Sequence, residues 1–507
     1  MHTATSRPAL LGIVGAGLMG RGIAQIAAQG GIPVVMHDAR PGGAREACQA
    51  IADTLGTLAG KGKIPQDACH AAVARLHAAS SLADLSSCTV VVEAIVENLQ
   101  AKRALLAELE ACVSPGCILA SNTSSLSVTA LAAGLQHPER VAGFHFFSPV
   151  PLMKVVEVIA GPLTRPEVAD TLVALGQQMG HTAVRASDTP GFIVNHAGRG
   201  YLTEALRLLG ESVAEPAVLD RILRDAAGFR MGPFELLDLT GLDVSQPVME
   251  SIYQQYYQEP RYRPSVIGRQ RQQAGLLGRK TQRGFYFYDG GKKLEIPEED
   301  LPAFKSLSPI WIHADDLKAF PPVATLLQTL GITPEAGSTP SPQALCVVLP
   351  LGHDASTLCA EAGLDPTRTV ALDPLFLTGR RTIMATPVTS QALRDAARVL
   401  FSADGIPASV VRDSTGCVVQ RVLASIVNIG CDMAQQGIAT PADIDKAVTL
   451  GLGYPHGPLA WGDALGAPTV LRILHRLFAL TEDPRYRPSP WLRRRAQLGL
   501  SLLTPDH

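Results

Sequence analysis

A glycine-rich turn near the start of the chain constrains its fold more than any other feature. The apolar run 10–14 precedes Gly15-Ala-Gly17-Leu-Met-Gly20, and an apolar helical pattern and a second apolar run at 34–37 follow. Strand, turn, helix and strand in this order predict a βαβ unit that binds a dinucleotide. Gly15 permits the turn, Gly17 lets a pyrophosphate approach the backbone, and Gly20 lets helix and strand pack closely.

Asp38 ends the second predicted strand, 23 residues after Gly15. A carboxylate at this point accepts hydrogen bonds from the ribose hydroxyls of a dinucleotide and repels a 2′-phosphate. The sequence therefore predicts NAD as the cofactor rather than NADP, and nearby Arg40 weakens that preference. The alternative is a glycine turn that binds no ligand.

Strands and helices alternate after this unit, and the alternation predicts a doubly wound, mostly parallel sheet. The predicted strands are 90–92 and 118–120, and the predicted helices are 44–58, 66–76 and 99–109. Such sheets bind ligands at the carboxyl ends of their strands, where Glu93, Glu97 and residues 121–125 would lie. Lys61 and Lys63 form a short basic stretch, which is either a solvated helix end or a clamp for the phosphates of a large anionic substrate carrier.

His145 and Glu157 each interrupt an otherwise apolar strand. His145 lies among aromatic residues, and Glu157 lies among β-branched residues. A carboxylate in such a strand requires a partner. A histidine–carboxylate pair suits carbonyl–alcohol redox chemistry, because the imidazole takes the hydroxyl proton while hydride leaves the neighbouring carbon, and the carboxylate stabilises the imidazolium. The alternatives are a core histidine and a structural ion pair.

The segment 188–195 leads into a helical apolar pattern. Its Pro190 and Gly191 mark a helix start and predict a domain boundary. Asn195 then lies in the first turns of the helix, where its amide either reaches a reacting oxygen or thioester carbonyl, or caps or links helices.

Seven sequence blocks between residues 11 and 290 follow one another in an order typical of a known family. They are Gly-Ala-Gly-Leu-Met-Gly, Val-Val-Glu-Ala-Ile-Val-Glu-Asn, Ser-Asn-Thr-Ser-Ser-Leu, Phe-His-Phe-Phe, Val-Val-Glu-Val-Ile, Asp-Thr-Pro-Gly-Phe-Ile-Val-Asn and Met-Gly-Pro-Phe-Glu-Leu-Leu-Asp. With these blocks the chain resembles the L-3-hydroxyacyl-CoA dehydrogenase family over essentially the whole length of that family.

This resemblance implies a role for each matching residue. It implies His145 as the general base, Glu157 as its partner, and Ser124 and Asn195 as hydrogen-bonding groups around the reacting oxygen and the thioester. It implies that Lys61 lies near coenzyme A, and that the cofactor lies against Gly15, Gly17, Gly20, Asp38, Glu97, Lys102, Ser124 and Ser148. The family usually has Asn where this chain has Ser148, and we expect a weaker cofactor contact there.

The helical part of the chain occurs twice, at a displacement of 225 residues. Residues 413–420 repeat the pattern of 188–195, and apolar strands upstream of them predict a remnant of a nucleotide-binding fold that lacks the glycine turn. The positions of Glu157, Asn195 and Glu204 are taken by Thr382, Gln420 and Ile429. The second copy has therefore lost the acid and the amide, and we predict one active site, in the first half.

The predicted fold is α/β plus all-α, with four domains and a linker. They are an NAD-binding Rossmann domain at 8–187, a helical dehydrogenase C-terminal domain at 188–289, a linker at 290–308, a degenerate Rossmann-like domain at 309–412 and a second helical domain at 413–507. Because small members of the family pair through the helical domain, we expect the two copies to form an internal pseudo-dimer, with further homo-oligomerisation left open.

This long architecture resembles the 3-hydroxyacyl-CoA dehydrogenases of bacterial phenylacetate catabolism, whose family substrate is 3-hydroxyadipyl-CoA. The leading hypothesis is NAD-dependent oxidation of a (3S)-hydroxyacyl-CoA to the 3-oxoacyl-CoA, with the hydroxyadipyl thioester preferred. One alternative is a general short-chain or 3-hydroxybutyryl-CoA dehydrogenase. The other is a non-catalytic dinucleotide-binding protein related to lens crystallins.

The charge balance and the cysteine content limit the possible partners and cellular compartment of the protein. Lys and Arg number 44 against 46 Asp and Glu, which excludes a basic nucleic-acid binder. The N-terminal apolar run is too short for a membrane span and lacks the features of a signal peptide. The 9 cysteines form no metal-binding pattern, and Cys117 and Cys346 are expected to be buried reduced thiols. We expect a cytoplasmic enzyme with no nucleic-acid, membrane or metal partner.

Overall fold

The computed structural model describes residues 9–302 and 309–506. The chain forms two compact units. The first ends at His196 and also takes in the later segment Gln436–Leu452, and the second holds Ala197–Gln435 and the chain from Gly453 onward. The last residues of the predicted linker, 303–308, lie outside the described residues. Within the two described ranges no helix has the length and apolar character needed to cross a membrane.

The first unit is built on an eight-stranded sheet in the order β3-β2-β1-β4-β5-β6-β7-β8. Its strands are β1 (Leu11–Val14), β2 (Val34–His37), β3 (Leu76–Ala78), β4 (Val90–Glu93), β5 (Ile118–Ser121), β6 (Val141–Phe146), β7 (Val155–Ala160) and β8 (Thr182–Ser187). Strands β1 to β6 are mutually parallel in the order of a Rossmann fold. The last two strands, β7 and β8, are parallel to each other and antiparallel to β6. The predicted doubly wound sheet is confirmed.

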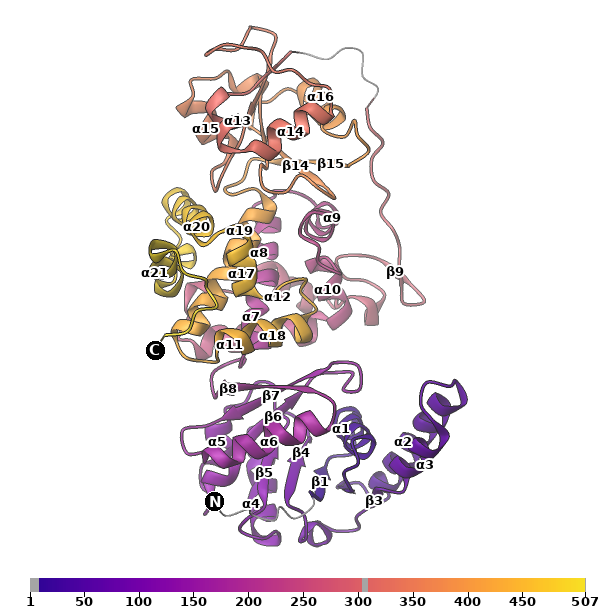
Figure 1. The fold of residues 1–507 in the computed structure, drawn as a ribbon. Coiled ribbons are helices and arrows are strands. Elements are labelled where there is room, and N and C mark those ends of the chain that lie inside the picture. Colours follow the sequence, from indigo (N-terminus) through magenta and orange to yellow (C-terminus); the bar gives the residue numbers. More distant parts are fainter. Residues whose placement is uncertain (1–8, 303–308, 507) are drawn as a thin grey trace. The chain divides into compact units, whose positions relative to one another are not determined.

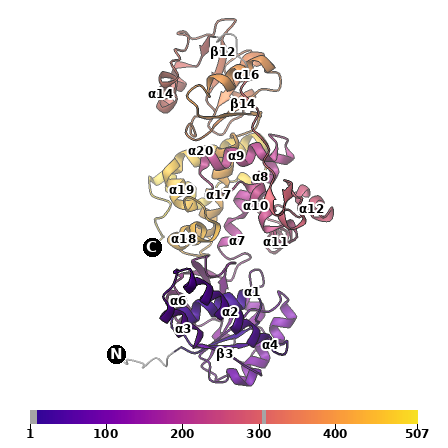
Figure 2. The same cartoon turned by 90° about the vertical axis from the view of Figure 1, so that its right-hand side faces the viewer.

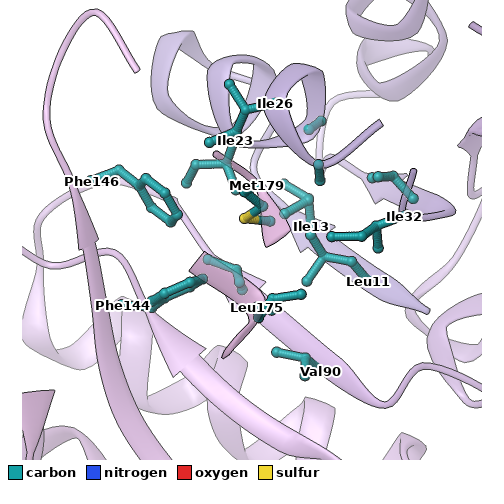
Figure 3. Packing of buried hydrophobic residues seen from close by; sticks show 14 of the residues in the cluster. Leu11, Ile13, Ile23, Ile26, Ile32, Val90, Phe144, Phe146, Leu175 and Met179 are labelled. Atoms are coloured by element: carbon teal, nitrogen blue, oxygen red, sulfur yellow. The ribbon is translucent and has the colours of Figure 1, made fainter. Parts of the chain in front are cut away.

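Helices flank this sheet (Figure 1). They are α1 (Leu18–Gln29), α2 (Gly43–Gly60), α3 (Gln66–Val73), α4 (Leu99–Cys112), α5 (Val128–Ala132) and α6 (Pro166–Gln178). The short helix α7 (Val194–Ala197) follows β8 in the chain, and the later α18 (Pro441–Leu452) packs on β7 and β8. The apolar face of α1, with Ile23 and Ile26, packs on β1 and β2, and its side chains share a buried cluster with Leu175 of α6 (Figure 3). Burial of these side chains, each worth about 2 kcal/mol, holds the glycine turn between β1 and α1 in place.

The second unit contains a helical domain and a smaller second sheet (Figure 2). Its helices in the first copy are α8 (Arg199–Gly210), α9 (Pro216–Ala227), α10 (Pro233–Thr240), α11 (Leu242–Gln255) and α12 (Val266–Gln273). Those of the second copy are α17 (Val418–Gln435), α19 (Pro458–Leu465), α20 (Ala467–Thr481) and α21 (Pro490–Leu498). Helices α8 and α17, which are equivalent in the two copies, lie side by side at Gly200 and Ile426 (Figures 1 and 2).

The second sheet has five strands in the order β11-β12-β13-β14-β15. They are β11 (Ile310–Trp311), β12 (Leu345–Val348), β13 (Thr369–Leu372), β14 (Arg381–Ala385) and β15 (Ala408–Arg412). The helices between them are α13 (Ala314–Ala319), α14 (Pro321–Thr329), α15 (Ala355–Glu361) and α16 (Gln391–Leu400). A separate hairpin of β9 (Tyr288–Asp289) and β10 (Lys292–Lys293) precedes this sheet in the chain. Parallel, parallel, antiparallel and parallel pairs follow one another, which is the pattern of β4 to β8 in the first sheet.

Individual side chains repeat as well as strands. Buried Arg140 donates to the carbonyls of Ser114 and Cys117, and Arg368 donates in the same way to those of Ser341 and Ala344. The second sheet is therefore a copy of the second half of the Rossmann sheet. Among the described residues this sheet has no counterpart of β1 to β3, in agreement with the lack of a second glycine turn in the sequence.

Asp373 follows β13 in this second sheet and is fully buried. Its Oδ1 accepts from the amide of Gln420 at 2.8 Å, and among the described residues Oδ2 has no partner. Burial raises the pKa of Asp373 to about 6. Ionisation at neutral pH therefore costs stability.

We predict that Asp373→Asn raises the thermal midpoint at neutral pH. The folded pKa lies above the usual value near 3.9, so the stabilising contribution of the protonated group is complete below that value and is lost as pH rises through about 6. The variant keeps an oxygen for Gln420 and has no charge to lose. Melting curves between about pH 4 and about pH 8 should show the variant gaining a few degrees over wild type only at the upper end. An equal difference at both ends would contradict the assignment.

Candidate active site

The register of β6 and β7 brings His145 and Glu157 into contact. The two residues face each other directly in the antiparallel pair. The Nδ1 of His145 lies 2.6 Å from Oε2 of Glu157, and both side chains are buried. The rings of Phe147 and Phe192 pack beside the imidazole. The pair is thus shielded from water, which strengthens the attraction between its members.

The second oxygen of Glu157 is held by backbone groups. Oε1 accepts from the amides of Ile193 and Val194, each at 2.9 Å, at the turn that enters α7. With the imidazole, the buried carboxylate has three hydrogen-bond partners, which offset the cost of removing its charge from water. The sequence gives no signal for these amides, because any residue except proline carries one.

Glu97 is a second centre of hydrogen bonding. Its Oε1 accepts from the hydroxyl of Thr123 at 2.7 Å and from the amides of Ser124 and Ser125. Burial alone would raise the pKa of Glu97, but the bond from Thr123 and the ammonium of Lys102 outweigh burial and lower it. Glu97 is therefore an anion that fixes the loop after β5.

Lys102 lies beneath this loop and is almost completely buried. Its ammonium is 2.6 Å from Glu93 and 3.3 Å from Glu97. Glu93 is itself fully buried and also accepts from the hydroxyl of Ser121 and the amide of Ile95. Glu93 was expected at the carboxyl edge of the sheet, and there it serves as the counter-ion of Lys102.

Asn195 joins the loop after β5 to the start of α7. Its amide nitrogen donates to the carbonyl of Ser124 at 3.3 Å. Asp188 makes a further link, because its carboxylate accepts from the amides of Val128 and Thr129 at the start of α5. The structure therefore brings Ser124 and Asn195 together, as it does His145 and Glu157.

The three glycines of the turn differ in what surrounds them. A Cβ at Gly20 would lie 1.8 Å from the carbonyl oxygen of Gly15, and Gly15 has a φ of 105°. A Cβ at Gly17 would meet no protein atom within 4 Å. The packing of the protein thus requires Gly15 and Gly20, whereas the open space at Gly17 fits the close approach of a pyrophosphate to the start of α1.

Asp38 ends β2 beside this turn. Its Oδ2 accepts from the amide of Ala16 at 2.7 Å, so the carboxylate lies where a ribose would follow the pyrophosphate. Arg40 is paired with Glu46 at 2.6 Å. The guanidinium that could weaken the preference for NAD therefore already has an anionic partner.

Lys61 and Ser148 lie at the surface. Lys61 directly follows the last residue of α2 and is exposed, and Ser148 follows β6 and is also exposed. Both are accessible to a ligand.

The equivalent region of the second copy lacks these groups. Asp373, at the His145 position, donates its amide to the carbonyl of Thr382, at the Glu157 position. Gln420, at the Asn195 position, bonds to Asp373 and to the carbonyl of Pro350. Positions 373 and 382 therefore hold a carboxylate and a hydroxyl in place of the imidazole and the carboxylate of the first copy.

Comparison with known proteins assigns the family. Residues 10–189 match the 3-hydroxyacyl-CoA dehydrogenase, NAD binding domain, and residues 191–288 and 416–502 both match the C-terminal domain of the same family. The chain belongs to the 3-hydroxyacyl-CoA dehydrogenase family. The two C-terminal matches confirm the internal duplication, and the N-terminal match confirms NAD as the cofactor.

Relatives of this dehydrogenase include short and long proteins. The chain is 36% identical over 488 residues to the 3-hydroxyadipyl-CoA dehydrogenase of Escherichia coli, covering 96% of this chain and 97% of that protein. It is 43% identical to a probable 3-hydroxybutyryl-CoA dehydrogenase of Deinococcus radiodurans, covering 55% of this chain and 99% of that protein. A crystal structure of 3-hydroxybutyryl-CoA dehydrogenase from E. coli K12 superposes with a TM-score of 0.85 at 35% identity, covering 97% of this chain and 99% of that one.

We predict that Gly17→Ala and Gly20→Ala separate cofactor binding from folding. Alanine at position 17 should leave the thermal midpoint of the ligand-free protein unchanged and weaken NAD binding by on the order of tenfold, or about 1.4 kcal/mol. Alanine at position 20 should destabilise the ligand-free protein by about 1–3 kcal/mol, because it overlaps the carbonyl of Gly15. Calorimetric NAD titration and melting curves measure both effects. Unchanged NAD affinity in Gly17→Ala would place the pyrophosphate elsewhere.

Proposed function

We propose that this dehydrogenase oxidises (3S)-3-hydroxyadipyl-CoA to 3-oxoadipyl-CoA with NAD, in the breakdown of phenylacetate. The observation that carries the chemistry is the buried contact between His145 and Glu157. The full-length similarity to a 3-hydroxyadipyl-CoA dehydrogenase, which includes the second copy, supports the choice of substrate.

His145 is the proposed general base. Because Glu157 occupies Nδ1, Nε2 is the nitrogen that would take the proton of the substrate hydroxyl as the C3 hydride leaves. NAD supplies the hydride acceptor. Glu157 stabilises the imidazolium that forms and fixes the orientation of the ring. The protonated His145 then returns its proton to solvent or, in the reverse direction, to the carbonyl oxygen.

The remaining predicted site residues have proposed binding roles. Ser124 provides a hydroxyl on the loop after β5, and Asn195 provides an amide in α7, one residue after the Val194 amide that binds Glu157; both groups are proposed to bind the reacting oxygen and the thioester. Glu97 and Lys102 are proposed near the nicotinamide ribose, and Ser148 near the cofactor. Lys61, exposed at the end of α2, is proposed to bind a phosphate of coenzyme A. The domain boundaries also stay a proposal, which the spans of the family matches support.

Two alternative functions differ in their support. The function of a 3-hydroxybutyryl-CoA dehydrogenase is supported by the superposing crystal structure, which carries that name. A non-catalytic dinucleotide-binding protein is disfavoured by the intact set in the first copy, since the second copy has lost the acid and the amide.

The two helical copies are proposed to pair as an internal pseudo-dimer. Support comes from reciprocal hydrogen bonds: Arg261 donates to the carbonyl of Arg487, and Arg485 donates to that of Arg263. These residues correspond at a displacement of 224. Glu204 of the first copy, whose position in the second copy is taken by Ile429, is buried with its Oε1 2.6 Å from Nε of Arg421. Such reciprocal contacts are typical of an isologous interface.

We also propose a reducing cytoplasm as the location. Cys117 and Cys346 are buried free thiols, and burial raises the pKa of Cys117 to about 12. A thiol of this kind is inert and needs no oxidising compartment.

The substrate assignment predicts a preference between two thioesters. NADH formation is measured by absorbance with (3S)-hydroxyadipyl-CoA and (3S)-hydroxybutyryl-CoA at matched concentrations. We expect kcat/KM at least about tenfold higher for the dicarboxylic thioester, a difference of about 1.4 kcal/mol. Equal or reversed values would remove the phenylacetate assignment but keep the chemistry. No NADH from either substrate would favour the non-catalytic alternative.

The base assignment predicts the effect of His145→Gln. Loss of a general base lowers kcat by about 10²- to 10⁴-fold, while NAD affinity stays near that of wild type because the glycine turn is untouched. Stopped-flow turnover and NAD titration test this, with His77→Gln, on the exposed strand β3, as the matched control. Near-normal turnover in His145→Gln would remove it from the base role.

A further inference from the structure

Helix α18 belongs to the second helical copy in sequence but lies in the first compact unit. It packs on β7 and β8, the strands at the edge of the first sheet. The loop before it is tied to the end of β8, because the amide of Ser187 donates to the carbonyl of Ile438 at 2.8 Å and its hydroxyl donates to that of Gly437. The second copy therefore covers the strand that carries Glu157.

Gly451, near the end of α18, is the point of closest approach. A Cβ at this position would lie 2.8 Å from Cγ2 and 3.1 Å from Cγ1 of Val194, and 3.5 Å from Cγ1 of Val155. Val155 and Val194 are both buried, so neither has free space into which to move. The glycine lets α18 lie directly on the side chain of Val194.

Val194 also holds the catalytic carboxylate. Its amide donates to Oε1 of Glu157 at 2.9 Å, and Oε2 of the same carboxylate lies 2.6 Å from His145. A continuous series of contacts thus leads from Gly451 to the side chain of Val194, from the amide of Val194 to the carboxylate of Glu157, and from that carboxylate to the imidazole. Displacement of Val194 moves the amide that orients the acid.

From this series we infer that Gly451 is a positioning residue for the His145–Glu157 pair, and that the second helical copy supports this pair through the contact of α18 with Val194. This inference rests on the proposed dehydrogenase function. It assigns a role to a copy that has lost its own acid and amide.

The first copy provides an internal comparison. Its equivalent helix is α9, which packs on β14 of the second sheet, and the residue equivalent to Gly451 is Ala226. The amide of Arg412 donates to the carbonyl of Val213 there, as the amide of Ser187 donates to that of Ile438. The helix of each copy thus packs on the sheet of the other copy. Helix α9, on the sheet without the catalytic acid, has Ala226, whereas α18, on the sheet with Glu157, has Gly451.

Gly451→Ala tests the inference. Alanine favours a helix over glycine, so weakening of α18 itself cannot explain a loss of activity. We expect kcat to fall by about 10- to 100-fold, the effect of a misplacement on the order of 1 Å, with KM for NAD unchanged. Gly56→Ala is the matched control, because Gly56 lies within α2 and a Cβ there meets no atom within 4 Å. The control should keep wild-type kcat.

A second substitution makes the test specific. Val194→Ala removes both methyl groups that a Cβ at position 451 would meet and keeps the amide that binds Glu157. The double variant Val194→Ala/Gly451→Ala should therefore regain the kcat of Val194→Ala alone within about threefold. Wild-type kcat in Gly451→Ala, or a loss that Val194→Ala does not rescue, would overturn the inference.

The NMR resonance of the His145 Nδ1 proton is a readout that does not depend on turnover. It is assigned by its absence in His145→Gln. We expect it to shift in Gly451→Ala and to return in the double variant, and an unshifted resonance would overturn the inference. An inactive wild-type protein would instead refute the proposed function, and the resonance would still report on Gly451.

Discussion

The buried hydrogen bond between His145 and Glu157 is the interaction on which the rest of the site depends. A carboxylate without exposure to water is stable only when all of its charge is compensated. The imidazole compensates one oxygen and the amides of Ile193 and Val194 compensate the other. The turn into α7 must therefore lie against β7.

The neighbouring loop follows the same principle. Glu97 gathers the hydroxyl and amide groups that follow β5, and Lys102 supplies the positive charge beneath them. A loop with its own buried counter-ion is already ordered before a ligand arrives, which reduces the entropy lost on binding. Pre-organisation of this kind explains why charged residues occupy positions that would otherwise favour apolar side chains.

The second copy keeps structural hydrogen bonds of the first copy but not its catalytic groups. It keeps the groups that hold strands and helices together: Arg368 bonds like Arg140, and Asp413 bonds to the start of α15 as Asp188 bonds to the start of α5. It has lost the acid, and Gln420 binds Asp373 instead. A copy retained for packing preserves hydrogen bonds to its own backbone, because their loss leaves buried carbonyls unpaired.

The sequence by itself determined the glycine turn, the alternation of strands and helices, the duplication, and the presence of His145 and Glu157 within apolar strands. These are local or periodic signals, and each follows from the conformational limits of glycine and from the spacing of apolar residues. Only the tertiary structure decided that Glu93 is the counter-ion of Lys102, that backbone amides hold Glu157, and that α18 lies on Val194. Those contacts join segments as far apart as Glu157 and Gly451, and a backbone amide or a glycine without a side chain leaves no chemical mark in the sequence that identifies its partner.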